Sequence, residues 1–521
     1  MATLSIVQGD MRKYVTVTPG ITVLEGLRTG GFLHVEAPCG GSGRCGRCLA
    51  KITGEVSSVS PRERALLTPG DERRLMCLTV IQGDCTVELG LDSLTAAEEG
   101  LSRFVSQGGG TGLGAAVDIG TTTVVLHLCS RATGETLATV SAGNAQRSFG
   151  ADVIARVQHA MEHPDGLAAQ TAAIRTQLTE LLARACAQAD RSPSEVEEVY
   201  VAGNTVMEHL FAGLSPAGIA VAPFTPASLF GNTVPAETFG LGTAPDATLT
   251  LAPCVSGYVG GDITAGLMAV DAAHAEQPVL FVDVGTNGEM ALGDQNGLLC
   301  CSTAAGPAFE GACISCGMAA VPGAIDKVWL ENDQICCSVL GRGQALGLCG
   351  SGLLDALAVL LKLEIVDETG RLLPADEAPA QFADRLEGEG RFVRFHLTEH
   401  VWVSAEDVRR LQLAKAAIAA GIETLMEEKG LTAADISVFY LAGGFGSFLR
   451  PESAAAIGLF PSDLLPKLHV VGNSAGAGAR AALLSKEARH ALTATQGLCE
   501  YLELSGLAQF NDAYLDHMIF E

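Results

Sequence analysis

The sequence predicts two domains, a small α+β module over residues 1–92 and a larger, internally duplicated α/β domain over residues 114–521. Charge supports this division, because residues 1–92 carry ten basic and ten acidic side chains, so the rest of the chain holds the whole net charge of −26. A repeat supports the duplication. The string VDIGTTT at 117–123 returns as VDVGTNG at 282–288, which predicts one copy in each of two lobes.

Composition excludes several classes of protein. The chain has 521 residues, of which 48% are hydrophobic and 18% charged, so it can bury substantial cores. Its 59 acidic side chains outnumber 33 basic ones, which argues against nucleic acid as a partner. The longest uncharged run, 210–236, holds four prolines and predicts a buried loop region rather than a membrane span. No secretory signal is visible, so we expect a cytoplasmic protein.

The elements follow from local patterns. Short β-rich runs at 14–17 and 85–89, with a helical run at 22–28, predict the small α+β module. A polar, glycine-rich stretch predicts a flexible linker over 93–113. Beyond it, apolar strands alternate with alanine-rich helical patterns, as in packed α/β units. We place the two lobes of the second domain roughly at 114–275 and 276–521.

A glycine-rich cysteine loop is the strongest motif of the first domain. Cys39, Cys45 and Cys48 stand as C-x5-C-x2-C, and Cys77 follows after a gap of 28 residues. This spacing is close to the plant-type pattern that binds a [2Fe-2S] cluster, and the intervening glycines allow the loop to wrap closely around it. Cys85 competes with Cys77 as the fourth ligand, but strand alternation predicts an inward, structural role for it. Structural zinc is the alternative metal.

Other cysteines are expected to be structural. Cys313 and Cys316 form a second C-x2-C, so a second cluster is conceivable, but they lie among small residues where buried cysteine acts as a small apolar side chain. The histidines show no spacing typical of a metal site, and we assign none of them as a ligand.

The repeated string predicts two phosphate-binding β-hairpins. Each copy follows one apolar run and precedes another, and its turn offers backbone N–H groups and short polar side chains to a phosphate. Asp118 and Asp283, one in each copy, are the candidate catalytic carboxylates that hold hydrated Mg²⁺ with ATP. The expected phosphate contacts are Gly120, Thr121, Thr122 and Thr123 in the first hairpin, and Gly285, Thr286, Asn287 and Gly288 in the second.

Small residues predict the remainder of the nucleotide site. Gly443, Gly444 and Gly446 follow an apolar strand and leave room for a flat base, so we assign them to the adenosine. The segments 256–262 and 472–478 are also rich in small residues, which permit the close helix approach that a hinge between lobes requires. Gly472 and Asn473 complete the predicted set.

This order of hairpins, connecting helices and adenosine loop resembles the acetate and sugar kinase, Hsp70 and actin superfamily, whose ATPase domain is a duplicated, ribonuclease-H-like α/β fold. Joined to a ferredoxin-like [2Fe-2S] domain, it resembles the reductive activators of corrinoid enzymes. Strings similar to that family are NAQRSFGADV at 144–153, GNT at 203–205, GPAFEG at 306–311, LQLAK at 411–415 and LSG at 504–506.

The resemblance implies an ATP-hydrolysing activase. It implies that one electron from a low-potential donor passes through the cluster to the inactive Co(II) corrinoid of a methyltransferase system's corrinoid protein, which returns to Co(I). One rival is an activator of a radical dehydratase or an aryl-CoA reductase, which normally carries a [4Fe-4S] cluster. Another is a ferredoxin carrier with a nucleotide-sensing domain that does not hydrolyse ATP. Longer family members have a separate middle domain, for which the linker leaves little room.

One further segment is a candidate contact for the corrinoid partner. Ser302 and Thr303 follow the second hairpin closely, so the nucleotide state could move them. Their small hydroxyl side chains would allow a corrinoid face to approach. We predict that the partner docks beside them and that the first domain swings on its linker.

Overall fold

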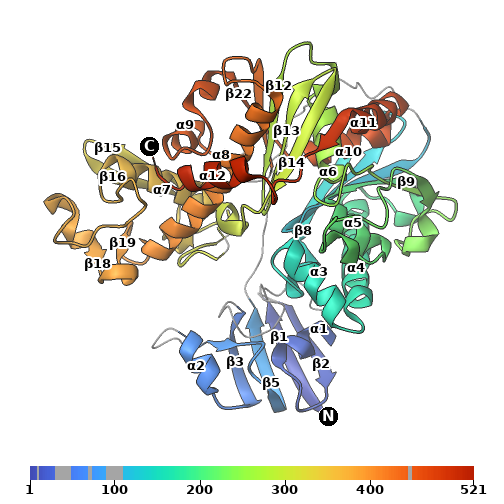
Figure 1. The fold of residues 1–521 in the computed structure, drawn as a ribbon. Coiled ribbons are helices and arrows are strands. Elements are labelled where there is room, and N and C mark those ends of the chain that lie inside the picture. Colours follow the sequence, from blue (N-terminus) through green and yellow to red (C-terminus); the bar gives the residue numbers. More distant parts are fainter. Residues whose placement is uncertain are drawn as a thin grey trace.

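The computed structural model describes residues 1–8, 11–29, 48–67, 73–89, 110–311, 313–318, 320–443 and 449–520. Figure 1 shows a small sheet at the N-terminal end and two larger lobes that follow it in the chain. Most of the predicted linker, 93–109, lies outside the described residues.

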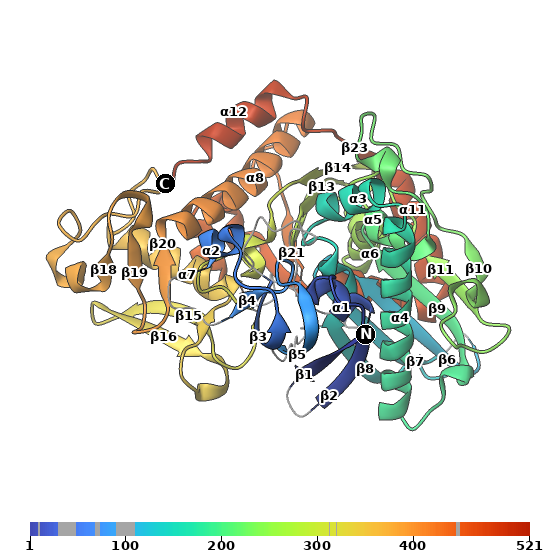
Figure 2. The same cartoon turned by 90° about the horizontal axis from the view of Figure 1, so that it is seen from below.

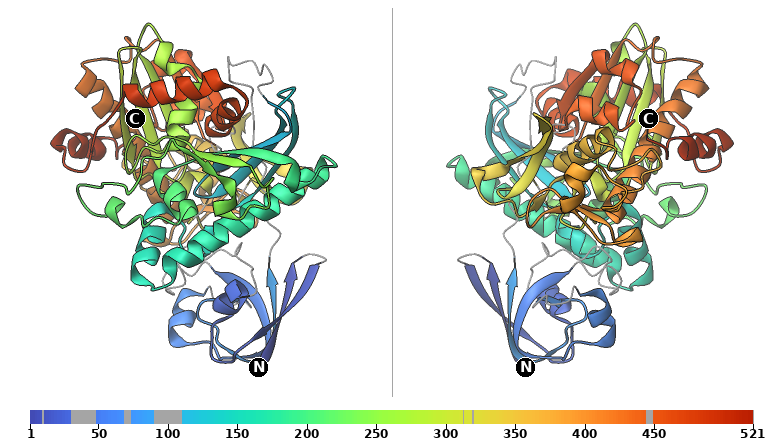
Figure 3. Two further views of the ribbon diagram at one scale, coloured as in Figure 1. Left: turned by 90° about the vertical axis from the view of Figure 1, so that its right-hand side faces the viewer. Right: turned by 90° about the vertical axis from the view of Figure 1, so that its left-hand side faces the viewer.

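The N-terminal domain is a five-stranded sheet in the order β2-β1-β5-β3-β4 and forms a body of its own (Figure 3). β1 pairs parallel with β5 and antiparallel with β2. Ile81, Cys85 and Val87 on β5 are buried in its core, so the predicted α+β module is confirmed. The elements are β1 (Ala2–Gln8), β2 (Met11–Val17), α1 (Val23–Thr29), β3 (Leu49–Val56), α2 (Pro61–Leu66), β4 (Arg74–Leu75) and β5 (Ile81–Leu89).

The two lobes are built on sheets of the same topology. The first contains the order β11-β9-β6-β7-β8 and the second the order β22-β21-β12-β13-β14. In each, three strands form an antiparallel meander and two further strands add in parallel to the first of them. This repeated order confirms the duplicated α/β fold. One extra edge strand completes each sheet, β10 in the first and β23 in the second.

The strands of the first sheet are β6 (Leu113–Ile119), β7 (Thr123–Ser130), β8 (Thr136–Gly143), β9 (Val196–Gly203), β10 (Thr233–Pro235) and β11 (Thr248–Leu251). Those of the second are β12 (Val279–Val284), β13 (Gly288–Asp294), β14 (Gly297–Thr303), β21 (Val438–Ala442), β22 (Leu468–Gly472) and β23 (Cys499–Tyr501). Two small sheets extend the second lobe, made of β15 (Ala324–Glu331), β16 (Gln334–Val339) and β17 (Gly347–Leu348), and of β18 (Leu386–Glu387), β19 (Arg394–His396) and β20 (Trp402–Ser404).

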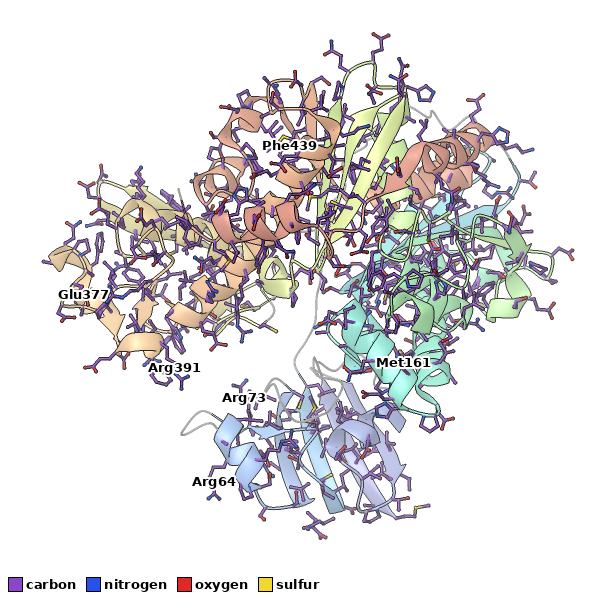
Figure 4. The ribbon with its side chains drawn as sticks, viewed as in Figure 1. Arg64, Arg73, Met161, Glu377, Arg391 and Phe439 are labelled. Carbon is purple, nitrogen blue, oxygen red and sulfur yellow. The ribbon has the colours of Figure 1, made fainter. Side chains whose placement is uncertain are left out.

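Helices cover both lobes. The first lobe has α3 (Val153–Glu162), α4 (Gly166–Gln188) and α5 (Thr205–Ala212), and the second has α7 (Gly350–Lys362), α8 (Ala405–Lys429), α9 (Pro451–Ala456) and α12 (Ala508–Asp516). Figure 2 shows α12 lying along α8. Phe439 of β21, labelled in Figure 4, is fully buried in the second lobe, where its ring meets Phe460 edge-on.

Three helices join the lobes, namely α6 (Gly261–Ala269), α10 (Ser474–Leu484) and α11 (Lys486–Leu498). Although α10 and α11 follow the last parallel strand of the second sheet, they pack with α6 against the first sheet. A Cβ atom at Gly478 of α10 would lie 2.2 Å from the carbonyl oxygen of Ala265 on α6. Gly478 therefore permits a close helix contact, but its partner Ala265 lies just beyond the predicted segment 256–262, whose Gly260 and Gly261 approach Asn204 and Glu208 instead.

One prediction about the first lobe is wrong. Residues 210–236 do not form a buried loop region, because most of them after Ala212 are exposed to solvent, including Val221, Leu229 and Val234. The lack of charge in this run does not reflect burial, because its small and proline residues form irregular surface backbone. Among the described residues, none of the helices has the length and apolar character needed to cross a membrane.

We predict that Gly478→Ala destabilises the protein by about 2 kcal/mol or more, because the added methyl group overlaps the backbone of α6 and must push the two helices apart. The matched control is Gly497→Ala on α11, where a Cβ atom meets nothing within 4 Å and alanine favours the helix. Chemical denaturation measures both. Equal stability of the two variants would contradict the close contact between α6 and α10.

Candidate nucleotide and cluster sites

Asp118 lies near the end of β6, and a side chain from the far end of the chain reaches it. The Asp118 carboxylate accepts a hydrogen bond of 2.9 Å from Nδ2 of Asn473. Asn473 follows β22 and caps α10, where its Oδ1 accepts from the N–H of Gly476. The structure therefore brings two predicted site residues together across the lobes.

Three side chains that the sequence analysis did not assign hold the turn of the first hairpin. Asn144 Nδ2 donates to the carbonyl of Gly120 over 2.8 Å, and Asn204 Nδ2 donates to Oγ1 of Thr121 over 2.9 Å. The buried Arg156 guanidinium donates to the carbonyl of Thr121, and its burial lowers its pKa to about 9. These contacts fix the backbone that would present N–H groups to a phosphate.

The second hairpin carries Asp283 and packs tightly against the predicted adenosine loop. A Cβ atom at Gly443 would lie 2.4 Å from the carbonyl oxygen of Val284 and 2.8 Å from Asp283 Oδ1, and the φ angle of Gly443 is +101°. Glycine is required there on both counts. The N–H of Gly443 also bonds the carbonyl of Gly472, which joins two predicted segments. Gly444 and Gly446 lie outside the described residues.

The tips of the two hairpins touch. Oγ1 of Thr122 lies 3.2 Å from Oγ1 of Thr286, and both hydroxyls donate to Oε2 of Glu310, over 2.6 and 3.0 Å. Glu310 belongs to the string GPAFEG, to which the sequence pattern assigns no role. The other predicted contacts lie in or beside the same turns, with Thr123 opening β7, Gly288 opening β13, and Asn287 accepting a backbone bond from Gly285.

Acidic groups crowd the space between the lobes. Burial and the nearby Asp262 carboxylate raise the pKa of Asp118 to about 7. The pKa of Asp283 is raised to about 8 by burial and by repulsion from Asp262, Asp118 and Glu310. Asp262 near the start of α6 has its own pKa raised to about 6 by burial. In the sequence, Asp262 is recognisable only as part of the predicted hinge segment 256–262. This arrangement favours a cation or protons at the site.

The acidic side chains at this site could hold Mg²⁺ only together with water or phosphate ligands. In the described part of the chain, no group of three or more histidine, cysteine or acidic side chains has the geometry of a metal site. Mg²⁺ is commonly held by one or two carboxylates together with water and substrate phosphates. The carboxylates of Asp118 and Asp283 fit that pattern.

Two of the four predicted cluster ligands are described, and they lie together. Sγ of Cys48 is 3.1 Å from Sγ of Cys77, and both residues are buried. Cys48 directly precedes β3, and its carbonyl accepts from the N–H of Met76 over 2.8 Å. Convergent thiols are the ligands that iron-sulfur clusters take, so this pair fits the group. Cys39 and Cys45 lie outside the described residues.

A buried ion pair supports the Cys77 side of this site. Glu63 is fully buried, and its carboxylate accepts from Nε of Arg74 over 2.8 Å and from the N–H of Leu75 over 3.0 Å. Burial alone would raise the pKa of Glu63, but these hydrogen bonds lower it. The pair anchors β4, two residues before Cys77.

The remaining candidate thiols sit elsewhere. Cys85 is buried in the N-terminal core on β5, where burial raises its pKa, as expected for a structural thiol. Cys316 is half-buried in the second lobe, and burial raises its pKa to about 11. Cys313 is also half-buried and has a positive φ angle of 64°.

The two candidate partner contacts differ in exposure. Ser302 is half-buried on β14, opposite Glu289 of β13. Thr303 is buried, and its hydroxyl donates to the carbonyl of Gly288 over 3.2 Å. Thr303 thus stabilises the β13–β14 pairing, and only Ser302 keeps part of its surface in solvent. Docking of a partner at this place stays a prediction.

Sequence comparison matches three family models to successive parts of the chain. They are the 2Fe-2S iron-sulfur cluster binding domain over residues 6–82, the RACo middle region over 113–275, and the C-terminal ASKHA domain of RACo over 277–521. The expectation was that the linker at 93–113 leaves little room for a separate middle domain, and the match places the middle region after that linker, over 113–275. The middle region is present, and it coincides with the first lobe.

Individual relatives agree with these matches. The chain is 34% identical to "Corrinoid activation enzyme RamQ" of Eubacterium limosum, with 78% of this chain and 70% of that protein covered. It is 27% identical to "[Co(II) methylated amine-specific corrinoid protein] reductase" of Methanosarcina barkeri, with 77% and 76% covered. A solved structure titled "Reductive activator for corrinoid,iron-sulfur protein" is 28% identical, with a TM-score of 0.73 and 99% and 98% covered.

We predict that Cys77→Ser loses or strongly shifts a [2Fe-2S] cluster, because its sulfur faces Cys48, whereas Cys85→Ser retains the cluster, because Cys85 lies in the strand core. Visible absorbance and iron content of the anaerobically purified full chain measure this. The reverse pattern in the two variants would overturn the ligand assignment.

We predict that the nucleotide-free protein loses stability as the pH rises from about 5 to about 8. An unfolded aspartate has a pKa of about 3.9, whereas Asp118 and Asp283 titrate near 7 and 8 in the folded chain. The folded state therefore binds more protons over this range, and deprotonation there costs stability. The midpoint of thermal unfolding measures the trend.

Asp283→Asn should reduce the pH-dependent loss of unfolding free energy by an amount on the order of 2 kcal/mol. This figure is smaller than the full pKa shift implies, because the carboxylate keeps contact with solvent. The exposed Asp376→Asn is the control and should leave the profile unchanged. A wild-type stability that rises over this range would contradict the crowded-carboxylate description.

Proposed function

The chain belongs to the RACo family, and on that premise we propose that it is an ATP-dependent reductive activator that returns the Co(II) corrinoid of a partner protein to Co(I). One observation supports the proposal that the activity depends on a nucleotide. Two hairpins from opposite lobes meet at Thr122 and Thr286, with Asp118 and Asp283 beside them. A polyphosphate with its cation would satisfy both the hydroxyls and the carboxylates at this place.

The proposed ligands divide between the two domains. Cys39, Cys45, Cys48 and Cys77 would hold the [2Fe-2S] cluster, which when bound supplies electrons one at a time. Asp118 and Asp283 would hold Mg²⁺ with the phosphates of ATP, and Gly443 would leave room for the adenosine beside the second hairpin. Asn144, Asn204 and Arg156 position the first turn and need not touch the nucleotide.

The nucleotide is needed because the electron transfer is uphill. Plant-type clusters have potentials near about −400 mV, and an acceptor roughly 100 to 200 mV lower opposes the transfer by about 2 to 5 kcal/mol. ATP can offset this only by binding one arrangement of the lobes or of the docked partner more tightly than the other. The helix α6, which packs against both sheets, and α10, which leads from the second sheet onto the first, would carry such a change.

The partner we propose is the corrinoid protein of a methyltransferase system. The Methanosarcina barkeri relative is named as the reductase of a methylated amine-specific corrinoid protein, which supports a corrinoid protein as the partner. A low-potential donor would supply the electron, and a cytoplasmic location stays a prediction. The rival functions differ in the acceptor or in the absence of hydrolysis, so a single reaction mixture can separate them.

We predict that Asp118→Ala and Asp283→Ala each lower ATP hydrolysis and Co(I) formation by about 100-fold or more, because each removes a carboxylate expected to hold the Mg²⁺ of the nucleotide. The full chain, a Co(II) corrinoid protein, reductant and ATP are mixed anaerobically, and Co(I) absorbance and phosphate release are followed. The exposed Asp376→Ala serves as the control.

Wild-type Co(I) formation at the same rate without ATP would favour a simple ferredoxin carrier and contradict the proposal. Hydrolysis at the wild-type rate in both aspartate variants would show that the two hairpins are not the nucleotide site.

A further inference from the structure

We propose that Glu310 is a phosphate-mimicking latch, which holds the two hairpins together in the nucleotide-free chain and is displaced when a polyphosphate binds. The inference rests on the proposed function and names a regulatory contact within the same site.

The carboxylate occupies the place expected for an anion. Its Oε2 accepts from the hydroxyls of Thr122 and Thr286, which are the side chains predicted to receive phosphate oxygens. Its Oε1 lies 4.0 Å from the position of a Cβ atom on Gly285, in the turn of the second hairpin. A carboxylate on these partners stands in for one face of a phosphate group.

The latch joins parts of the chain that otherwise belong to different lobes. Thr122 lies between β6 and β7 of the first sheet, whereas Thr286 lies between β12 and β13 of the second. Arg147 and Arg156 of the first lobe add attraction to the same carboxylate. Glu310 therefore bonds the nucleotide-free lobes directly at the point where a nucleotide would otherwise bridge them.

Glu310 lies on a short turn between two glycines. Glu310 ends a short 3₁₀ turn, Pro307–Glu310, that is flanked by Gly306 with a φ angle of +77° and by Gly311 with a φ angle of +73°. Phe309 is fully buried and anchors the turn to the second lobe. Displacement of the carboxylate would therefore release the hairpin of the first lobe while the turn stays attached to the second.

Displacement of Glu310 by a nucleotide would also change the structure next to β14. The turn begins four residues after Thr303, the last residue of β14, and Thr303 itself is bonded to Gly288 at the start of β13. A phosphate bound to Thr286 would therefore affect both the turn that carries Glu310 and the end of β14 at Thr303. The same step that breaks the latch would then alter the backbone around Ser302.

If the Glu310 carboxylate and the phosphates compete for the same hydroxyls, removing the carboxylate changes the affinity for Mg-ATP in a known direction. Removing the carboxylate should free both hydroxyls and remove a negative charge, so Mg-ATP should bind more tightly to Glu310→Ala than to wild type, by about fivefold or more. Glu310→Gln should fall between them, because its amide oxygen still accepts a hydrogen bond but carries no charge. Glu399→Gln, exposed in the same lobe, should bind like wild type.

Titration calorimetry of the full chain with Mg-ATP measures these affinities, and thermal unfolding verifies that each variant is folded. Hydrogen exchange of peptides spanning 304–311 adds an independent readout. Exchange there should rise when Mg-ATP binds wild type, and should already be high in nucleotide-free Glu310→Ala.

The outcomes separate the two proposals. Weaker or unchanged binding in both Glu310 variants would overturn the latch, with weaker binding identifying Glu310 as a ligand of the metal or the phosphates. Tight wild-type binding with no change in exchange over 304–311 would also overturn it and leave the proposed function standing. Failure of wild type to bind Mg-ATP at all would overturn both.

Discussion

Repulsion between crowded, half-buried carboxylates is the interaction on which the rest of this structure depends. Asp118, Asp262 and Asp283 approach one another from three different elements, and burial raises the pKa of each. Such a cluster is costly unless protons or a cation neutralise it. The fold tolerates that cost because it holds the two hairpin turns rigidly, through asparagine side chains, the Arg156 guanidinium and the tight contact at Gly443.

The duplicated topology explains why this cluster lies between the lobes. Both sheets begin with an antiparallel hairpin whose turn lies at the same edge as the ends of the parallel strands. Because α10 leaves the second sheet and packs on the first, Asn473 can reach Asp118 from the opposite lobe. A ligand that binds both turns therefore acts on the relation between the lobes, which suits a protein that must couple nucleotide binding to a reaction on a separate partner.

The sequence predicted what depends on local pattern. The repeated string placed both hairpin turns, and alternation identified Cys85 as a core thiol of β5. The sequence did not predict the tertiary contacts. Asn144 and Asn204 are recognisable as helix caps, but their bonds to the first turn depend on packing between distant segments. The bridging role of Glu310 depends on the contact between Thr122 and Thr286, which no local pattern predicts. In the run 210–236, most residues after Ala212 are exposed, because absence of charge does not by itself require burial.

The most direct test of the central claim is to locate the metal of a bound nucleotide. Crystals of the full chain with Mn²⁺ in place of Mg²⁺ and a non-hydrolysable ATP analogue would reveal the ion by its anomalous scattering. The account predicts one Mn²⁺ between Asp118 and Asp283, with phosphates against the turns at Thr122 and Thr286. An ion and nucleotide bound away from both hairpins, or contacting the turn of one lobe only, would contradict it.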